Sequence, residues 1–354
     1  MNLDDLDRFR EIDREDMLSK IEGLPDQLQA AWDLGQRLPL PEVDQVRQIV
    51  IAGMGGSAIG GDLLAAYIAP LISVPVIVWR NYDLPAFASG PETLVIASSH
   101  SGNTEETLSA FQCGRERDVQ LMAMTTGGEL ASQAEIHGVP LWGFNHGGPP
   151  RAAVGYSFGL LLAIVARLNL ISDPAEEVMN AVEAMRRQQK KLSVEVPVTE
   201  NTAKRIAGQL IGRWSTIVGS GLLAPVARRW RTQLSELAKA AAHFEELPEA
   251  DHNMVAGVFQ PEAFLPSSMV IFLRGTHVHP RNLLRVEATC DVLMLEGLGT
   301  MVVEAGGETR LAQQWTSLHL GDYSAFYLAM AYGVDPTPVA VIEGLKGMLA
   351  QTNS

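Results

Sequence analysis

One stretch of the sequence decides the fold: Thr93-Leu-Val-Ile-Ala-Ser-Ser-His-Ser-Gly-Asn-Thr-Glu-Glu106. It begins with a continuous apolar run, which is typical of a strand buried on both faces. Serine, glycine, asparagine and threonine then break the run, and a segment of helical length follows. A strand that passes through a glycine turn into a helix is the repeating unit of a parallel sheet covered by helices. The stretch therefore predicts an α/β fold.

The same alternation of short apolar runs and helical segments extends in both directions from this stretch. It predicts a first group of strands at 48–52, 76–79, 93–97, 121–124 and 140–142. It predicts a second group at 215–218, 269–273 and 300–303, followed by a closing helix at 312–332. A strand–glycine–helix unit thus occurs twice, at Val50 and at Ile217, which indicates two similar α/β domains.

The pattern also divides the chain into four parts. We expect a helical, acidic lead-in over residues 1–40 and a first domain over 41–172. A charged helical linker is expected at 173–198, and a second domain with C-terminal helices at 199–354.

Composition and charge exclude several classes of partner. The chain has 354 residues and a formal net charge of -14, which argues against binding to nucleic acid or to an anionic membrane surface. The two cysteines, Cys113 and Cys290, lie far apart, and the N-terminal region has no apolar leader. The most apolar stretch, 154–171, contains Arg167 and is interpreted as a buried helix. These features predict a cytoplasmic protein, in which an anionic substrate needs a local binding site.

The first candidate site is a glycine-rich turn, Gly53-Met-Gly-Gly-Ser-Ala58, between an expected strand and helix. Glycines there let the backbone approach an anion, and free helix N–H groups can receive it. The turn also fits the dinucleotide-binding fingerprint. That fingerprint wants an acidic residue at the end of the second strand, where this chain has Arg80 and Asn81, with Asp83 later. A tight turn without a ligand remains an open alternative.

The second candidate site is richer in hydroxyls. Ser99, Ser101 and Thr104 surround a glycine at the start of an expected helix. One hydroxyl is enough for a helix cap, so several in register favour binding of a phosphate through hydroxyl and amide donors. His100 lies within the same loop.

Together the two loops resemble the sugar isomerase (SIS) domain, in which Gly-Gly-Ser precedes Ser-x-Ser-Gly-x-Thr. The combination is similar to the bifunctional phosphoglucose/phosphomannose isomerases of archaea and some bacteria. The likeness continues at Gln233-Leu-Ser-Glu-Leu-Ala-Lys-Ala240, Asp251-His-Asn253 and Leu318-His-Leu-Gly-Asp-Tyr323, so it covers nearly the whole chain apart from the lead-in and the linker. One departure is Leu237, which stands where the family usually has asparagine.

The resemblance implies two tandem SIS domains, each a parallel-sheet αβα sandwich. It implies an aldose–ketose isomerase that interconverts glucose 6-phosphate and mannose 6-phosphate with fructose 6-phosphate through an enediol, as a homodimer, without metal or cofactor. Matched residue by residue, the substrate-binding positions are Gly55, Gly56, Ser57, Ser99, Ser101 and Thr104. The catalytic positions are Arg151 (enediolate stabilisation), Glu236 (proton transfer), His252 (ring opening, in the partner subunit's site) and Lys346 (near the ring oxygen).

The chemistry fits these residue types, although each also has an ordinary structural explanation. Moving a proton between C1 and C2 requires a base, and the enediolate requires a nearby cation. A histidine suits proton transfer near pH 7. Without the resemblance, Glu236 in an expected helix at 234–242 is equally a solvated carboxylate paired with Lys239. Arg151 and His252 are equally surface residues.

Three other classes of function, and a metal site, compete with the isomerase. A sugar-phosphate-binding regulator would not need Glu236 and His252 at their motif positions. An amidotransferase would need a glutaminase domain with an N-terminal cysteine, whereas residue 2 is Asn2. A dehydrogenase would leave the hydroxyl loop without a role. The pair His277 and His279 suggests a metal, but zinc-dependent phosphomannose isomerases have an all-β fold, which the β/α alternation contradicts.

Overall fold

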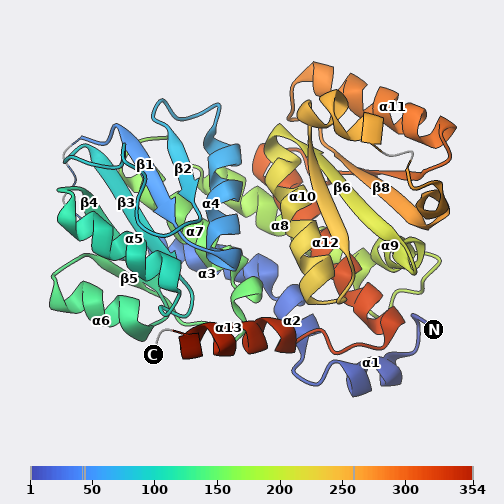
Figure 1. The fold of residues 1–354 in the computed structure, drawn as a ribbon, viewed down its shortest axis with the longest axis horizontal. Helices are drawn as coiled ribbons and strands as arrows, with labels where there is room; N and C mark the ends of the chain where they lie inside the picture. Colours follow the sequence, from blue (N-terminus) through green and yellow to red (C-terminus); the bar gives the residue numbers. More distant parts are fainter. Residues whose placement is uncertain (1, 42, 44, 258–259, 353–354) are drawn as a thin grey trace.

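The structure, a computed structural model, describes residues 2–41, 43, 45–257 and 260–352. The chain forms two lobes, and each lobe is built on its own parallel sheet (Figure 1). Both sheets carry helices on both faces. The predicted pair of αβα units is therefore confirmed.

The first lobe contains a five-stranded sheet in the order β2-β1-β3-β4-β5. All its pairings are parallel, so the carboxyl ends of the strands lie along one edge. The helices α3 (Leu24–Gly35), α4 and α7 cover one face, and α5 and α6 cover the other. The bounds are β1 (Gln48–Ala52), α4 (Gly55–Ile68), β2 (Val76–Trp79), β3 (Thr93–Ser99), α5 (Glu105–Glu116), β4 (Gln120–Thr125), α6 (Gly128–Ile136), β5 (Leu141–Gly143), η1 (Pro150–Ala152) and α7 (Val154–Arg167).

The second lobe repeats this plan with a four-stranded sheet in the order β7-β6-β8-β9. Here α9, α10 and α12 cover one face and α11 covers the other. The bounds are α9 (Thr202–Leu210), β6 (Trp214–Ser220), η2 (Gly221–Leu223), α10 (Ala224–Glu236), β7 (Ala242–Leu247), η3 (Glu249–His252), η4 (Met254–Gly257), η5 (Glu262–Ser267), β8 (Ser268–Arg274), α11 (Pro280–Leu295), β9 (Gly299–Glu304) and α12 (Arg310–Tyr332).

Three further helices contribute to the core that both lobes share, and a fourth follows at the C-terminus. They are α1 (Leu6–Ile12), α2 (Met17–Glu22), α8 (Ala175–Leu192) and the C-terminal α13 (Ala340–Thr352). One apolar cluster runs through both lobes, and in it the rings of Phe158 and Trp315 lie 5.1 Å apart. The N-terminal helices contribute to this cluster, so they are part of the core. α13 lies along the lower edge of Figure 1 with its apolar side chains exposed.

The structure corrects one local expectation near Glu236. The helix predicted at 234–242 ends at Glu236, and Ala242 already begins β7, which the sequence pattern missed. The chain turns because Lys239 adopts a left-handed conformation, with φ of 56°. The new strand then pairs in parallel with β6. Glu236 consequently lies at the end of a helix, where it faces Arg151 of the first lobe.

Over the described residues, no helix combines the length and apolar character that a membrane crossing requires.

Candidate active site

The two predicted binding loops lie side by side because their strands are neighbours. β1 pairs with β3 so that Ala52 lies opposite Ala97, and the segments that follow the two strands leave the sheet at the same edge. The backbone N–H of His100 donates to the Ser57 Oγ over 3.2 Å, which ties one loop to the other. The structure therefore brings Gly55, Gly56 and Ser57 next to the hydroxyl loop.

The hydroxyl loop forms a small cradle at the start of α5. Ser99 Oγ and Thr104 Oγ1 are 2.9 Å apart, and the N–H of Gly102 donates to Ser99 Oγ over 3.1 Å. Ser101 is exposed at the mouth of this loop. Among the described residues, no side chain caps the first turn of α4 or of α5. The positive ends of both helices therefore face the cradle, which suits a phosphate.

Arg151 is packed against the glycine turn that adjoins this cradle. A side chain at Gly56 would place its Cβ 2.4 Å from the carbonyl oxygen of Pro150, so the absence of a Cβ lets the arginine segment approach. The Arg151 side chain is buried, and its guanidinium donates to the carbonyls of Pro336 and Thr337. Burial lowers the pKa of Arg151, and the nearby Glu236 opposes that effect.

Glu236 approaches the same point from the other lobe. Its Oε2 lies 3.6 Å from Nη1 of Arg151, and its side chain is 29% exposed, so a substrate can reach it. Lys239 lies beside the pair, where its Nζ donates to the Glu236 carbonyl and, over 3.4 Å, to that of Pro336. Burial and the neighbouring Arg151 lower the pKa of Lys239. The site thus combines a carboxylate and cations near the hydroxyl cradle.

A second, fully buried ion pair holds this arrangement from behind, and the sequence did not reveal it. Arg229 binds Asp322 through two hydrogen bonds of 3.2 and 2.8 Å. The same guanidinium donates to the carbonyl of Arg151 over 2.7 Å. Asp322 belongs to the motif at 318–323, but Arg229 shows no sequence signal apart from its position on α10. We interpret Arg229 as a positioning residue for Arg151.

Comparison with known proteins places this geometry in context. Residues 199–349 match a family model described as the bacterial phospho-glucose isomerase C-terminal SIS domain. The chain is 38% identical to the bifunctional phosphoglucose/phosphomannose isomerase of Caldicellulosiruptor bescii, over 95% of this chain and 99% of that protein. It is 33% identical to the enzyme of the same name from Aquifex aeolicus, over 84% and 89%. The chain belongs to the bifunctional phosphoglucose/phosphomannose isomerase family.

The fold comparison agrees with that assignment. A glucose-6-phosphate isomerase like protein from Thermus thermophilus superposes with a TM-score of 0.64, at 19% identity, and covers 95% of this chain and 98% of that one. At this level of identity the similarity describes the fold alone. The two-lobed architecture of this family member is thus shared with solved phosphosugar isomerase-like proteins.

Two residues predicted to be catalytic, His252 and Lys346, lie outside the Arg151–Glu236 cluster of their own chain. His252 is exposed at the end of η3, while its neighbour Asp251 is held by Arg285 and Thr289. Lys346 is exposed on α13, one turn beyond Glu343, whose charge acts on Arg151. The roles of both residues remain predictions.

His100 and His146 form an additional pair behind the cradle. Their ring nitrogens Nε2 and Nδ1 are 3.0 Å apart. Burial, together with the charge of His146, lowers the pKa of His100 to about 4, so His100 is neutral at pH 7. Within the described ranges, no group of three histidine, cysteine or acidic side chains is arranged to hold a metal. Burial also lowers the pKa of His146, so the two rings pack as neutral imidazoles at the hydroxyl loop.

Proposed function

We propose that this isomerase interconverts glucose 6-phosphate and mannose 6-phosphate with fructose 6-phosphate, without a metal, through an enediol. The observation that carries the proposal is the contact between the acid–base pair and the glycine turn, which the Ser57 hydroxyl ties to the cradle. Gly56 packs on Pro150, and the adjacent Arg151 faces Glu236 at 3.6 Å. A hexose held by its 6-phosphate in the cradle would therefore present its other end to Glu236 and Arg151.

The proposed chemistry uses these side chains in turn. The Glu236 carboxylate takes the proton from C2 of the open-chain aldose, and the C2–H electrons form the C1–C2 double bond while O1 gains negative charge. The Arg151 guanidinium stabilises this enediolate. Glu236 then returns its proton to C1, and the hydroxyl proton of O2 passes to O1, so that C2=O forms and the ketose results. Because C2 is planar in the enediol, reprotonation there from either face yields glucose or mannose 6-phosphate.

The proposal includes a homodimer that supplies His252 from one subunit to the site of the other. The exposed position of His252, outside the Arg151–Glu236 cluster of its own chain, supports this arrangement. The exposed apolar side chains Leu284, Val292 and Leu295 on α11 offer area for such an interface. Lys346 would approach the ring oxygen from α13. We further place the enzyme in the cytoplasm, where its unpaired Cys113 and Cys290 would persist.

Product analysis tests the proposed function. Purified protein given fructose 6-phosphate should form both glucose 6-phosphate and mannose 6-phosphate, at rates that EDTA leaves unchanged. Each product is measured by its own coupled reaction. Glucose 6-phosphate alone would contradict the dual specificity, and loss of both products in EDTA would contradict metal independence. If folded protein binds the sugar phosphate and forms neither product, it is a sugar-phosphate-binding regulator.

The cradle predicts a selective change in substrate binding. Replacing Thr104 by Val removes one hydroxyl from the cradle while keeping the shape of the side chain. A hydrogen bond to a charged phosphate contributes about 1.5–3 kcal/mol, so KM should rise at least about tenfold. The turnover number should change much less, because Glu236 and Arg151 are untouched.

Steady-state kinetics with fructose 6-phosphate measures this effect, and Ser132→Ala on α6 is the matched control. Ser132 is an exposed hydroxyl on the same lobe that donates to the Gly128 carbonyl. A KM for Thr104→Val within twofold of the control would show that the cradle does not hold the phosphate.

A further inference from the structure

Lys239 adopts an unusual backbone conformation directly beside the proposed base. Its φ of 56° lies in the left-handed region, which residues other than glycine rarely adopt. Among the described residues, the other non-glycine positions with positive φ are Asp16, Asp83, Asp118 and Asn169. Aspartate and asparagine tolerate this region because their short polar side chains can form local hydrogen bonds. Lysine has no such advantage, and strained residues of this kind cluster at active sites.

The Lys239 ammonium binds two backbone carbonyls. Its Nζ donates to the carbonyl of Glu236 at the end of α10 and, over 3.4 Å, to the carbonyl of Pro336. The Arg151 guanidinium donates over 3.1 Å to the same Pro336 carbonyl. A carbonyl oxygen has two lone pairs, so it can accept from both cations. One peptide group thus links a cation of the first lobe to a cation of the second.

The segment that carries this carbonyl connects α12 to α13. Pro336 and Thr337 are buried although they belong to no helix or strand, and the Thr337 carbonyl also accepts from Arg151. The Thr337 N–H donates to Asp335 Oδ1 over 2.9 Å. The negative charge of Asp335 acts in turn on the Lys239 ammonium. The connecting segment is therefore held between the two cations of the site.

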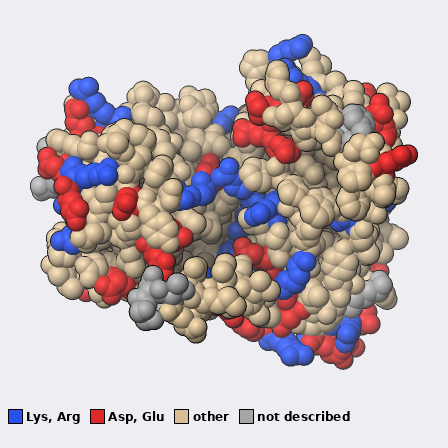
Figure 2. Space-filling view, viewed as in Figure 1, with Lys and Arg blue, Asp and Glu red and all other residues tan. Residues whose placement is uncertain are grey.

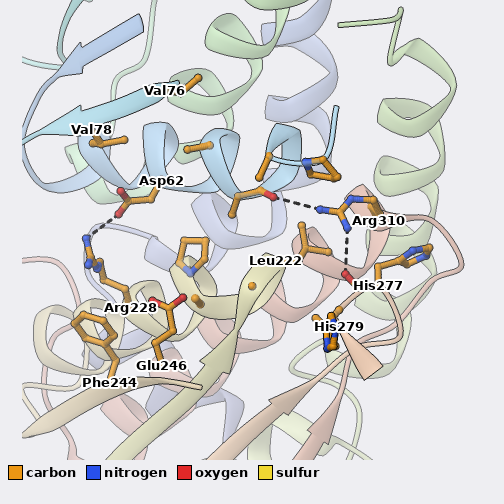
Figure 3. A pocket seen from close by; sticks show the side chains of 18 of the residues that line it. Asp62, Val76, Val78, Leu222, Arg228, Phe244, Glu246, His277, His279 and Arg310 are labelled. Atoms are coloured by element: carbon orange, nitrogen blue, oxygen red, sulfur yellow. Dashed lines mark hydrogen bonds and ion pairs between the residues drawn. The ribbon is translucent and has the colours of Figure 1, made fainter. Parts of the chain in front are cut away.

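Other contacts hold the two lobes together independently of Lys239. Around a cavity lined by α4, β2, α10 and β7, Arg228 binds Asp62 over 3.0 Å (Figure 3). At another point of this cavity, Arg310 donates to the carbonyl of Ala66 over 3.2 Å. Figure 2 shows the hollow between the lobes, with Lys and Arg side chains around it. Loss of the Lys239 ammonium would thus change the local spacing of the active site without separating the lobes.

We propose that Lys239 is a positioning residue of the active site. Its ammonium ties the end of α10, which carries Glu236, to the Pro336 carbonyl, which holds Arg151. This bridge keeps the base and the cation at their spacing of 3.6 Å. The inference rests on the proposed function, because it takes Glu236 as the base and Arg151 as the stabilising cation. A misplacement of about 1 Å is enough to slow such a step strongly.

Steady-state kinetics of Lys239→Asn with fructose 6-phosphate tests this role. Asparagine accepts the left-handed conformation but has no ammonium, so the turn is kept while the bridge is lost. We expect the turnover number to fall about ten- to a hundredfold, with KM within about twofold of wild type. Lys239→Arg keeps a cationic donor and should recover turnover to within about threefold of wild type. The midpoint of urea unfolding of Lys239→Asn should not fall below that of wild type, because backbone strain is relieved.

Asp118→Asn is the matched control, because it also places asparagine at a left-handed position that held a charged residue, with φ of 51°. Asp118 is exposed at the amino end of β4, whereas the binding loops lie at the carboxyl edge of the sheet. Turnover of Lys239→Asn within about twofold of this control would overturn the proposal. So would turnover of Lys239→Arg as low as that of Lys239→Asn. A rise of KM by about tenfold at unchanged turnover would contradict it too, since Lys239 would then be a substrate contact.

Hydrogen exchange separates this proposal from the isomerase assignment, because it needs no substrate. Peptides that contain residues 334–339, measured by mass spectrometry, should exchange faster in Lys239→Asn than in wild type or in Asp118→Asn, since the bridge no longer holds the segment. Unchanged exchange would overturn the bridge whether or not the protein isomerises sugar phosphates. An inactive wild type with an intact bridge would instead overturn the proposed function, and with it the catalytic part of this inference.

Discussion

Replacing Glu236 by Gln should lower turnover by a factor of about one hundred or more while substrate binding stays nearly intact, because an amide cannot take the proton from C2. The geometry predicts this separation of effects. The side chain lies 3.6 Å from Arg151, whereas the phosphate cradle is formed by other residues. The same variant should lose exchange of the C1 and C2 hydrogens with deuterated solvent, in parallel with turnover.

Steady-state kinetics, together with NMR detection of deuterium uptake, measures both effects. Glu135→Gln on α6 is the matched control, since it is an exposed glutamate away from the cleft, and it should behave as wild type. Turnover and deuterium exchange in Glu236→Gln within a few-fold of this control would show that another group is the base.

Removing the carboxylate of Asp322 should destabilise the protein by about 3–5 kcal/mol, because it leaves the Arg229 charge buried without its partner. The Arg229 and Asp322 side chains are only 2% and 4% exposed, so water cannot replace the lost carboxylate. Urea unfolding of Asp322→Ala against wild type measures this difference. A loss below about 1 kcal/mol, in the range of an exposed pair, would contradict the buried geometry.

A double variant separates stability from the positioning of Arg151. Arg229→Met combined with Asp322→Leu replaces the buried pair by apolar side chains, which is often close to neutral for stability. This variant still removes the 2.7 Å hydrogen bond from Arg229 to the carbonyl of Arg151. If Arg229 positions Arg151, the double variant recovers stability but keeps a lowered turnover number with KM little changed. Recovery of both would limit the pair to a structural role.

The sequence pattern predicted the strands of this fold well where burial is two-sided. β1 and β3 are continuous apolar runs, and the structure buries them almost completely. It failed at β7, an edge strand that is buried only at its two ends, Ala242 and Leu247, and exposed or partly buried between them. Ala240 and Ala242 have high helix propensity, so the sequence pattern predicted a helix that continues past Glu236. Pairing with β6 overrides that preference, an outcome that only tertiary contacts decide.

The sequence by itself determined the two α/β units and the two loops at the strand ends, because hydrophobic periodicity and turn residues act locally. Only the tertiary structure decided that Arg151 meets Glu236, 85 positions later, and that Arg229 and Asp322 hold them from behind. The cavity between β2 and β7 likewise exists only once the two lobes pack together. Residues that come together through packing of distant segments leave no periodic signal in the chain, and such contacts supply the charges of the proposed active site.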